Sequence, residues 1–219
     1  MSQPFRLNKE GLINRNKKIS FTFNGKKLFG YEGDTIASAL IANGIHLVGR
    51  SFKYHRPRGF FGAGVEEPNA KLQVEFNGHS EPNVNATEME LVEGLSATSQ
   101  NCWPSVNFDI GAINNFLKMF FPAGFYYKTF MWPKSFWYKI YEPFIRKAAG
   151  LGVASIEKDK ERYEHKFEYC DLLVTGSGPS GLASAYAAAK NGAKVILAED
   201  KPRSVSYTHL RAHETEQHL

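Results

Sequence analysis

A glycine-rich turn is the part of this sequence whose residue types and spacing most directly indicate chemistry. The string GSGPSG, residues 176–181, lies between an apolar run at 172–174 and an alanine-rich stretch that reaches Lys190. A second apolar run at 195–197 leads directly to Glu199. This order of strand, glycine turn, helix and acid-terminated strand is typical of a dinucleotide-binding β-α-β unit.

Each residue of the motif has a physical role in such a unit. Gly176 permits the tight turn, Gly178 lets the backbone approach a pyrophosphate, and Gly181 lets the helix lie close to the sheet. Glu199 can accept hydrogen bonds from a ribose diol and repels a 2′-phosphate, so NAD or FAD is expected rather than NADP. An empty, degenerate site is the alternative. The predicted cofactor-binding residues are Gly176, Ser177, Gly178, Pro179, Ser180, Gly181, Glu199 and Asp200, and no catalytic or metal-binding residue is predicted.

Composition and charge narrow the class of protein. The chain has 219 residues, with 27 Lys plus Arg against 22 Asp plus Glu and a formal charge of +5. Its basic residues are scattered among acids, whereas a nucleic-acid binder gathers them on one face, so no nucleic-acid partner is expected. Neither a run of about 18 apolar residues nor a secretory leader occurs, so we expect no membrane span and a cytoplasmic location. Two cysteines are too few for a disulfide framework, a zinc site or a four-thiolate cluster.

A small α+β domain of β-grasp type is predicted at residues 17–100, after an irregular arm at 1–16. Apolar and polar residues alternate from 19 to 23, which indicates a half-buried strand, and Asn24-Gly25 favours a two-residue hairpin turn. A helix cap is expected at Thr35. The remaining predicted elements are a returning strand at 27–31, a helix that ends near 43–44, and strands at 72–76 and 88–91.

An aromatic-rich connector is predicted at residues 101–167. From Phe116 to Phe144, 13 of 29 residues are Phe, Tyr or Trp, but prolines and lysines interrupt the stretch and rule out one transmembrane helix. Aromatic side chains supply a large apolar area, which favours an interface with another domain or subunit. Packing against this chain's own two domains and attachment to a membrane surface are the alternatives.

An α/β dinucleotide-binding domain of the Rossmann type is predicted to begin at residue 168 and to be truncated after 203. Two parallel strands and one helix cannot bury their apolar faces, so we expect the chain to be the front part of a longer protein. Residues 204–219 hold three of the seven histidines and no apolar periodicity, which indicates a non-native tail. His209 and His213 have the spacing of a metal-binding pair but lack a third ligand at a fitting distance.

Three long strings give this sequence a family resemblance. GRSFKYHRPRGFFGAGVEEPNA at 49–70, SQNCWPSVNFDIG at 99–111 and PAGFYYKTFMWP at 122–133 resemble the α subunits of heterotetrameric sarcosine oxidases. With the glycine turn included, the resemblance extends from about Phe21 to Asp200. Subunits of related opine and amine dehydrogenases share the general layout and are the nearest alternative.

The resemblance implies an α subunit with a ferredoxin-related domain, a dinucleotide-binding domain that holds NAD, and a folate-binding domain. It also implies β, γ and δ partner subunits, with FAD in the β subunit and FMN where α and β meet. The complex would demethylate sarcosine or another N-methyl amine oxidatively and pass the one-carbon unit to tetrahydrofolate. The fragment alone is predicted to be inactive, and a non-catalytic interaction module is the other alternative.

The loop at 46–64 departs from the ferredoxin pattern. A plant-type cluster needs four thiolates, three of them close together in this loop, and the loop has no cysteine, so we expect no iron–sulfur cluster. The role of its basic residues stays open between structural pairing and contact with an anion or partner. These residues are Arg50, Lys53, His55, Arg56 and Arg58.

Overall fold

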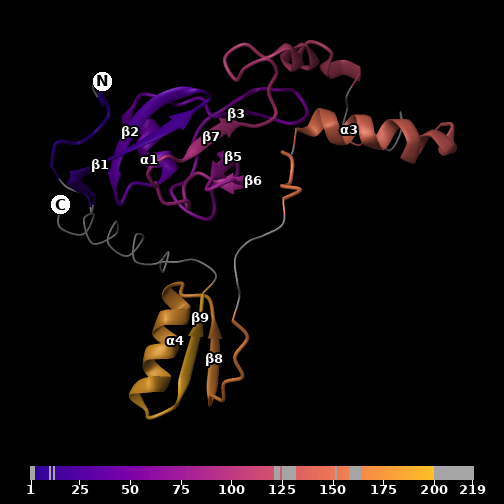
Figure 1. Ribbon diagram of the computed structural model, residues 1–219. Helices are drawn as coiled ribbons and strands as arrows, with labels where there is room; N and C mark the ends of the chain where they lie inside the picture. Colours follow the sequence, from indigo (N-terminus) through magenta and orange to yellow (C-terminus); the bar gives the residue numbers. More distant parts are fainter. Residues whose placement is uncertain are drawn as a thin grey trace. The chain divides into compact units, whose positions relative to one another are not determined.

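The computed structural model describes residues 3–9, 11, 13–120, 124, 132–150, 152–157 and 164–199 (Figure 1). The chain divides into two compact units, Met1–Asp159 and Lys160–Leu219. Within the described ranges, no helix combines the length and the apolar character needed to cross a bilayer. The finer domain limits given above stay predictions.

The first unit is built on a mixed five-stranded sheet (Figure 1). Its strands are β1 (Asn14–Phe23), β2 (Lys26–Glu32), β5 (Lys71–Phe76), β6 (His79–Asn85) and β7 (Ser96–Ser99). The order across the sheet is β2-β1-β7-β5-β6, in which only the β1–β7 pair is parallel among the described strands. Two short strands, β3 (Gly49–Arg50) and β4 (Pro57–Arg58), pair antiparallel beside it.

The first hairpin forms where the sequence predicts it. Asn24 and Gly25 both have positive φ, 48° and 76°, as a two-residue turn between twisted strands requires. The alternating side chains of β1 behave as expected, because Ile19, Phe21 and Phe23 are all buried in the core. The predicted inward face of this strand is confirmed.

Helix α1 (Ile36–Ala42) begins at the predicted cap. The Thr35 hydroxyl accepts a hydrogen bond from the Ser38 N–H, and the Ser38 hydroxyl accepts one from the Thr35 N–H, so two otherwise unpaired donors are satisfied. The helix ends at Ala42 with Asn43 as its C-cap, and Gly44 follows with a φ of 77°. Ile36 and Leu40 pack into the core with the sheet.

The strand predicted at residues 88–91 is wrong. The N–H groups of Glu88 and Met89 both donate to the Asn85 carbonyl, which makes a turn, and only an isolated bridge joins Glu90 to Thr35. The sheet instead gains β6 and β7, which were not predicted. β6 lies at the edge of the sheet, where the proline of its HSEPNVN sequence removes no essential ladder hydrogen bond.

The arm predicted at residues 1–16 is fixed to the domain through Arg6. Its guanidinium donates two hydrogen bonds to the Asp34 carboxylate, at 2.9 and 2.7 Å, and Asp34 is only 1% exposed. The Tyr31 N–H and the Ser38 hydroxyl donate to the same carboxylate, at 2.8 and 2.7 Å. The arm therefore supplies the cation that neutralises a buried acid, and its last residues form the start of β1.

We predict that Arg6→Ala lowers the free energy of unfolding by about 3 kcal/mol, because it leaves Asp34 buried without its cation. Urea denaturation of the full chain, followed by circular dichroism, measures this change. Lys9→Ala, an exposed site in the same arm, is the matched control and should change stability by less than about 0.5 kcal/mol. Equal effects of the two substitutions would contradict the assignment.

The aromatic-rich connector is partly helical. It contains short helices at Ile110–Asn115, Lys118–Phe120, Lys134–Phe136 and Trp137–Tyr141, followed by α3 (Glu142–Ala149). Several of its large side chains face outward, including Phe116, Trp132 and Tyr138. Much of the predicted aromatic stretch, at 121–123 and 125–131, lies outside the described residues. The described part therefore leaves a broad apolar surface uncovered within its own unit.

The second unit has the predicted order of strand, helix and strand. β8 (Leu172–Thr175) and β9 (Val195–Ala198) are parallel, with Leu172 opposite Val195 and Thr175 opposite Ala198. Between them in sequence, α4 (Pro179–Lys190) lies beside both strands (Figure 1). The predicted tail at 204–219 lies outside the described residues.

Candidate functional site

The glycine turn begins where β8 ends. Gly176 continues the parallel ladder, because its N–H donates to the Ala198 carbonyl at 2.8 Å. Its φ of 92° is strained for any residue with a side chain, so the turn needs glycine at this position. The chain then reverses from the sheet into α4 within three residues.

Gly181 is required by close packing. A Cβ atom at this position would lie 2.1 Å from the Gly176 carbonyl oxygen and 3.4 Å from the Val174 side chain. Only a residue without a side chain therefore allows the first turn of α4 to lie against the glycine turn. The role expected for Gly181 from the sequence has this physical basis.

The start of α4 has the features of an anion site. Gly178 is its N-cap, with an extended φ and ψ of −63° and 169°, and no side chain caps the helix. Pro179 occupies the first helical position, where its missing N–H costs nothing. The following amides, of Ser180 and Gly181, lie at the positive end of the helix dipole.

Glu199 reaches the same turn from the end of β9. Its Oε2 accepts a hydrogen bond from the Ser177 N–H at 2.7 Å and a second from the Ser177 hydroxyl. Ser177 is only 2% exposed, whereas Glu199 is exposed. The structure thus brings the glycine turn, the start of α4 and Glu199 together, and Asp200 lies outside the described residues.

The contact between Ser177 and Glu199 was not predicted. A hydroxyl in the second position of the turn, next to an acid at the end of the neighbouring parallel strand, is the signal that could have revealed it. Parallel strands end at the same edge of a sheet, so residues just beyond β8 and β9 meet there.

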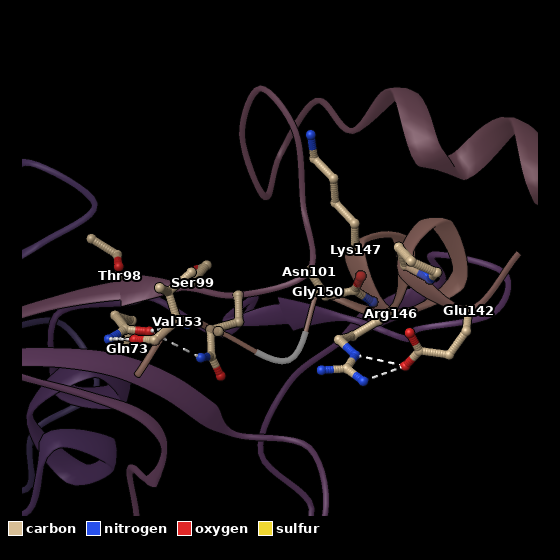
Figure 2. A pocket seen from close by; sticks show the side chains of 12 residues that line it. Gln73, Thr98, Ser99, Asn101, Glu142, Arg146, Lys147, Gly150 and Val153 are labelled. Carbon is tan, nitrogen blue, oxygen red and sulfur yellow. Dashed lines mark hydrogen bonds and ion pairs between the residues drawn. The ribbon is translucent and has the colours of Figure 1, made fainter. Parts of the chain in front are cut away.

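The first unit contains a groove of about 660 Å³ (Figure 2). Figure 2 shows the Arg146 guanidinium paired with the Glu142 carboxylate at one end of the groove. At the other end the Gln73 amide donates to the Val153 carbonyl at 3.2 Å and accepts from the Val153 N–H at 3.3 Å. These contacts attach residues 152–153 to the sheet, so the groove serves packing and holds none of the predicted site residues.

The basic loop is held by hydrogen bonds of its own and by hydrogen bonds to the segment at 101–115. The Arg50 guanidinium donates to the carbonyl oxygens of Val106, His55 and Asn107, at 2.8, 3.1 and 3.3 Å. The Arg56 Nε donates to the Asn115 side chain at 3.2 Å. These contacts favour structural pairing over an anion site for the two arginines.

His55 and Asp109 form a buried pair beneath this loop. The His55 Nδ1 lies 2.6 Å from the Asp109 carboxylate, which also accepts the N–H groups of Trp103 and Gly111 at 3.1 Å. Burial raises the pKa of the nearby Cys102 thiol, Asp109 raises it further, and Arg50 opposes both. Cys102 is therefore held as a neutral thiol rather than a nucleophile.

Glu67 is buried inside the loop at 59–70 and binds its main chain. It is 2% exposed, and its carboxylate accepts four main-chain N–H groups, from Phe61, Gly62, Asn69 and Ala70, at 2.6, 2.5, 2.7 and 3.3 Å. Burial raises the pKa of Glu67, but the four donors outweigh it and lower the pKa below its ordinary value. The charged form is thus stabilised by folding.

We predict that Glu67→Gln destabilises the chain by about 2–3 kcal/mol at pH 7. The substitution replaces one carboxylate oxygen by an NH2 group, which cannot accept hydrogen bonds from the main-chain N–H groups that face it. Because the pKa of Glu67 is lower in the folded than in the unfolded chain, its carboxylate stabilises the fold above the unfolded pKa. This stabilisation is lost as the pH falls through the folded pKa. The difference between the two proteins should therefore shrink below about pH 4. Glu66→Gln, an exposed neighbour that accepts two N–H groups, is the control. Equal effects measured by urea denaturation would contradict this account.

Two family models match the chain. Residues 16–102 match a family described as a 2Fe-2S iron-sulfur cluster binding domain, and residues 171–211 match one described as an FAD binding domain. The second match contains the whole predicted cofactor site. A ferredoxin-like domain followed by an FAD-binding domain is therefore shown, whereas the narrower Rossmann-type assignment stays a prediction.

The curated relatives agree with these matches. The chain is 60% identical over 196 residues to sarcosine oxidase subunit alpha of Rhizobium meliloti (strain 1021), covering 90% of this chain and 20% of that protein. The chain is homologous to part of sarcosine oxidase subunit alpha. The subunit alpha of Corynebacterium sp. (strain U-96) is 31% identical over 211 residues, covering 93% of this chain and 17% of that protein. The chain spans about a fifth of the length of the curated relatives that it matches.

One solved structure is also similar. A crystal structure of L-proline dehydrogenase from P. horikoshii has a TM-score of 0.45 and 20% sequence identity. The similarity covers 92% of this chain and 28% of that one.

The match at 16–102 corrects the cofactor prediction. The exclusion of an iron–sulfur cluster is wrong, because this region matches a 2Fe-2S cluster binding domain. The exclusion was based on the absence of cysteines from the loop at 46–64, whereas the match extends over the whole domain. In the part of the chain that the structure describes, Cys102 and Cys170 lie in different units and no three metal-binding side chains gather. Among the described residues, these donors do not make up the ligand set of a cluster.

We predict that Gly181→Ala loosens the second unit, because its Cβ would collide with the Gly176 carbonyl oxygen. The cost of such overpacking is about 1–3 kcal/mol. Hydrogen exchange of the full chain, read by mass spectrometry, should become faster in residues 172–198 and stay unchanged in the first unit. Ser184→Ala on the exposed side of α4 is the control, and unchanged exchange in both variants would contradict the packing argument.

Proposed function

We propose that this chain is part of a multi-subunit, flavin-dependent amine oxidoreductase of the sarcosine oxidase type. The observation that carries this proposal is the 60% identity to a sarcosine oxidase subunit alpha over 90% of the chain. The same relatives support companion subunits, because each is named as a subunit of an enzyme. Oxidative demethylation of sarcosine, or of another N-methyl amine, with tetrahydrofolate as one-carbon acceptor is the reaction that we propose for the complex.

Within that complex, this chain binds a dinucleotide, FAD or NAD, at the turn between β8 and α4. The residues present fit such a group: the N-cap of α4 has no capping side chain, and the close packing of Gly181 on Gly176 holds the start of the helix against the glycine turn. A bound dinucleotide of this class supplies two-electron redox chemistry. The FAD binding domain match supports this role.

Most of the predicted site residues have a defined part in that binding. The turn from Gly176 to Gly178 lets the backbone approach the pyrophosphate, and the amides of Ser180 and Gly181 donate to its oxygens. Pro179 sets the direction of the helix without using a donor. Glu199 accepts from the ribose hydroxyl groups, with Asp200 next to it in sequence.

The exposed aromatic surface of the connector supports the proposed subunit contacts. Phe116, Trp132 and Tyr138 are each more than four-fifths exposed, and Phe144 is 71% exposed. Buried interface cores are enriched in aromatic residues, and exposed patches of this kind commonly mark contact sites. We propose that partner subunits cover this surface in the complex.

We predict that the chain alone binds a dinucleotide but produces no hydrogen peroxide from sarcosine. Calorimetric titration with FAD and with NAD, in separate experiments, identifies the preferred ligand, and a coupled peroxide assay tests oxidation. Binding of neither ligand would overturn the proposed site. Peroxide above the protein-free background would overturn the assignment of amine oxidation to the rest of the complex.

A further inference from the structure

The contact between Ser177 and Glu199 joins a buried donor to an exposed acid. Ser177 is the one buried residue among residues 164–199. Both its main-chain N–H and its hydroxyl donate to the same oxygen of Glu199, Oε2. A residue of the glycine turn therefore holds the carboxylate that follows β9.

The backbone fixes the two ends of this contact. Thr175 and Ala198 are partners in the parallel ladder, and the Gly176 N–H donates to the Ala198 carbonyl. Ser177 and Glu199 are the next residues on each side, so their main chains are held at a set separation. Within this frame, the remaining freedom is that of the Glu199 side chain, which two hydrogen bonds to one oxygen restrict.

The position of this charge matters for the ligand. A carboxylate at the edge of the turn lies where the ribose next to the pyrophosphate must bind. Its negative charge repels a phosphate on that ribose, and the repulsion falls as the distance between the charges grows. A glutamate side chain that is free to turn toward solvent would lose much of this effect.

We propose that Ser177 is a positioning residue that holds the Glu199 carboxylate over the glycine turn and so makes the site reject dinucleotides that carry a 2′-phosphate. The inference rests on the proposed function and adds the residue on which ligand choice depends. The hydroxyl does this in addition to the main-chain N–H, which any residue at this position would supply.

The test compares two probes that share the pyrophosphate and the adenosine ribose. The dissociation constants of ADP-ribose and 2′-phospho-ADP-ribose are measured by calorimetry on the full chain at fixed ionic strength. The native chain should bind ADP-ribose more tightly. The discrimination is the dissociation constant of 2′-phospho-ADP-ribose divided by that of ADP-ribose. Ser177→Ala should lower this ratio by about tenfold, which is the effect of one hydrogen bond to a charged acceptor.

A double-variant cycle separates positioning from general loosening. Glu199→Gln removes the charge and should abolish most of the discrimination. If Ser177 acts through Glu199, adding Ser177→Ala to Glu199→Gln should change the ratio no further. Ser184→Ala, the same chemical change on the exposed part of α4, should leave the ratio at the native value. A merely structural role would weaken both probes equally and leave the ratio unchanged.

The outcomes distinguish this inference from the proposed function. Tight binding of ADP-ribose with an unchanged ratio in Ser177→Ala would overturn the role of Ser177 and leave the site itself standing. An additive effect in the double variant would also overturn it. Binding of neither probe by the native chain would overturn the proposed dinucleotide site, and the role of Ser177 with it.

Discussion

Loop N–H groups need acceptors, and in this chain carboxylates supply them. Asp34 accepts from Tyr31, Glu67 accepts from four loop residues, and Asp109 accepts from Trp103 and Gly111. A buried main-chain donor without a partner is costly, and a buried carboxylate without donors is costlier, so each satisfies the other. Two of these acids also pair with a basic side chain: Asp34 with Arg6, and Asp109 with His55. The irregular loops of the first unit are ordered by these contacts rather than by apolar packing alone.

Glu199 uses the same chemistry in the second unit, but at the surface. It accepts from Ser177 in the glycine turn, yet it stays exposed, so a ligand hydroxyl can approach the same carboxylate. One acid thus orders the turn and presents a charge to whatever binds there. The uncapped start of α4 lies beside it, so a positive helix end and a negative side chain border one turn. A dinucleotide, with its anionic pyrophosphate and neutral diol, has complementary groups for both.

Features fixed by a few neighbouring residues were predictable from the sequence. The Asn24-Gly25 turn, the cap at Thr35 and the order of β8, α4 and β9 depend on local chemistry, and the structure confirms them. Features fixed by distant partners were not. The sequence of residues 88–91 suggests a strand, but the N–H groups of Glu88 and Met89 donate to the Asn85 carbonyl and form a turn. Strand β6 forms by antiparallel pairing with β5. The Glu67 contacts likewise join parts of one loop in a way no spacing rule reveals. Counting thiolates failed for the domain at 16–102, because the match to a 2Fe-2S cluster binding domain extends over the whole domain and does not depend on the cysteines of one loop.

The central claim is that the turn from Gly176 to Gly181, with Glu199 beside it, is a dinucleotide site. Amide chemical shifts of the isotope-labelled full chain, recorded during titration with ADP-ribose, test it most directly. The account predicts saturable shifts that gather at the amides of Ser177, Gly178, Ser180, Gly181 and Glu199. Unmoved amides at these positions, or shifts that gather instead at the groove around Gln73, would contradict it.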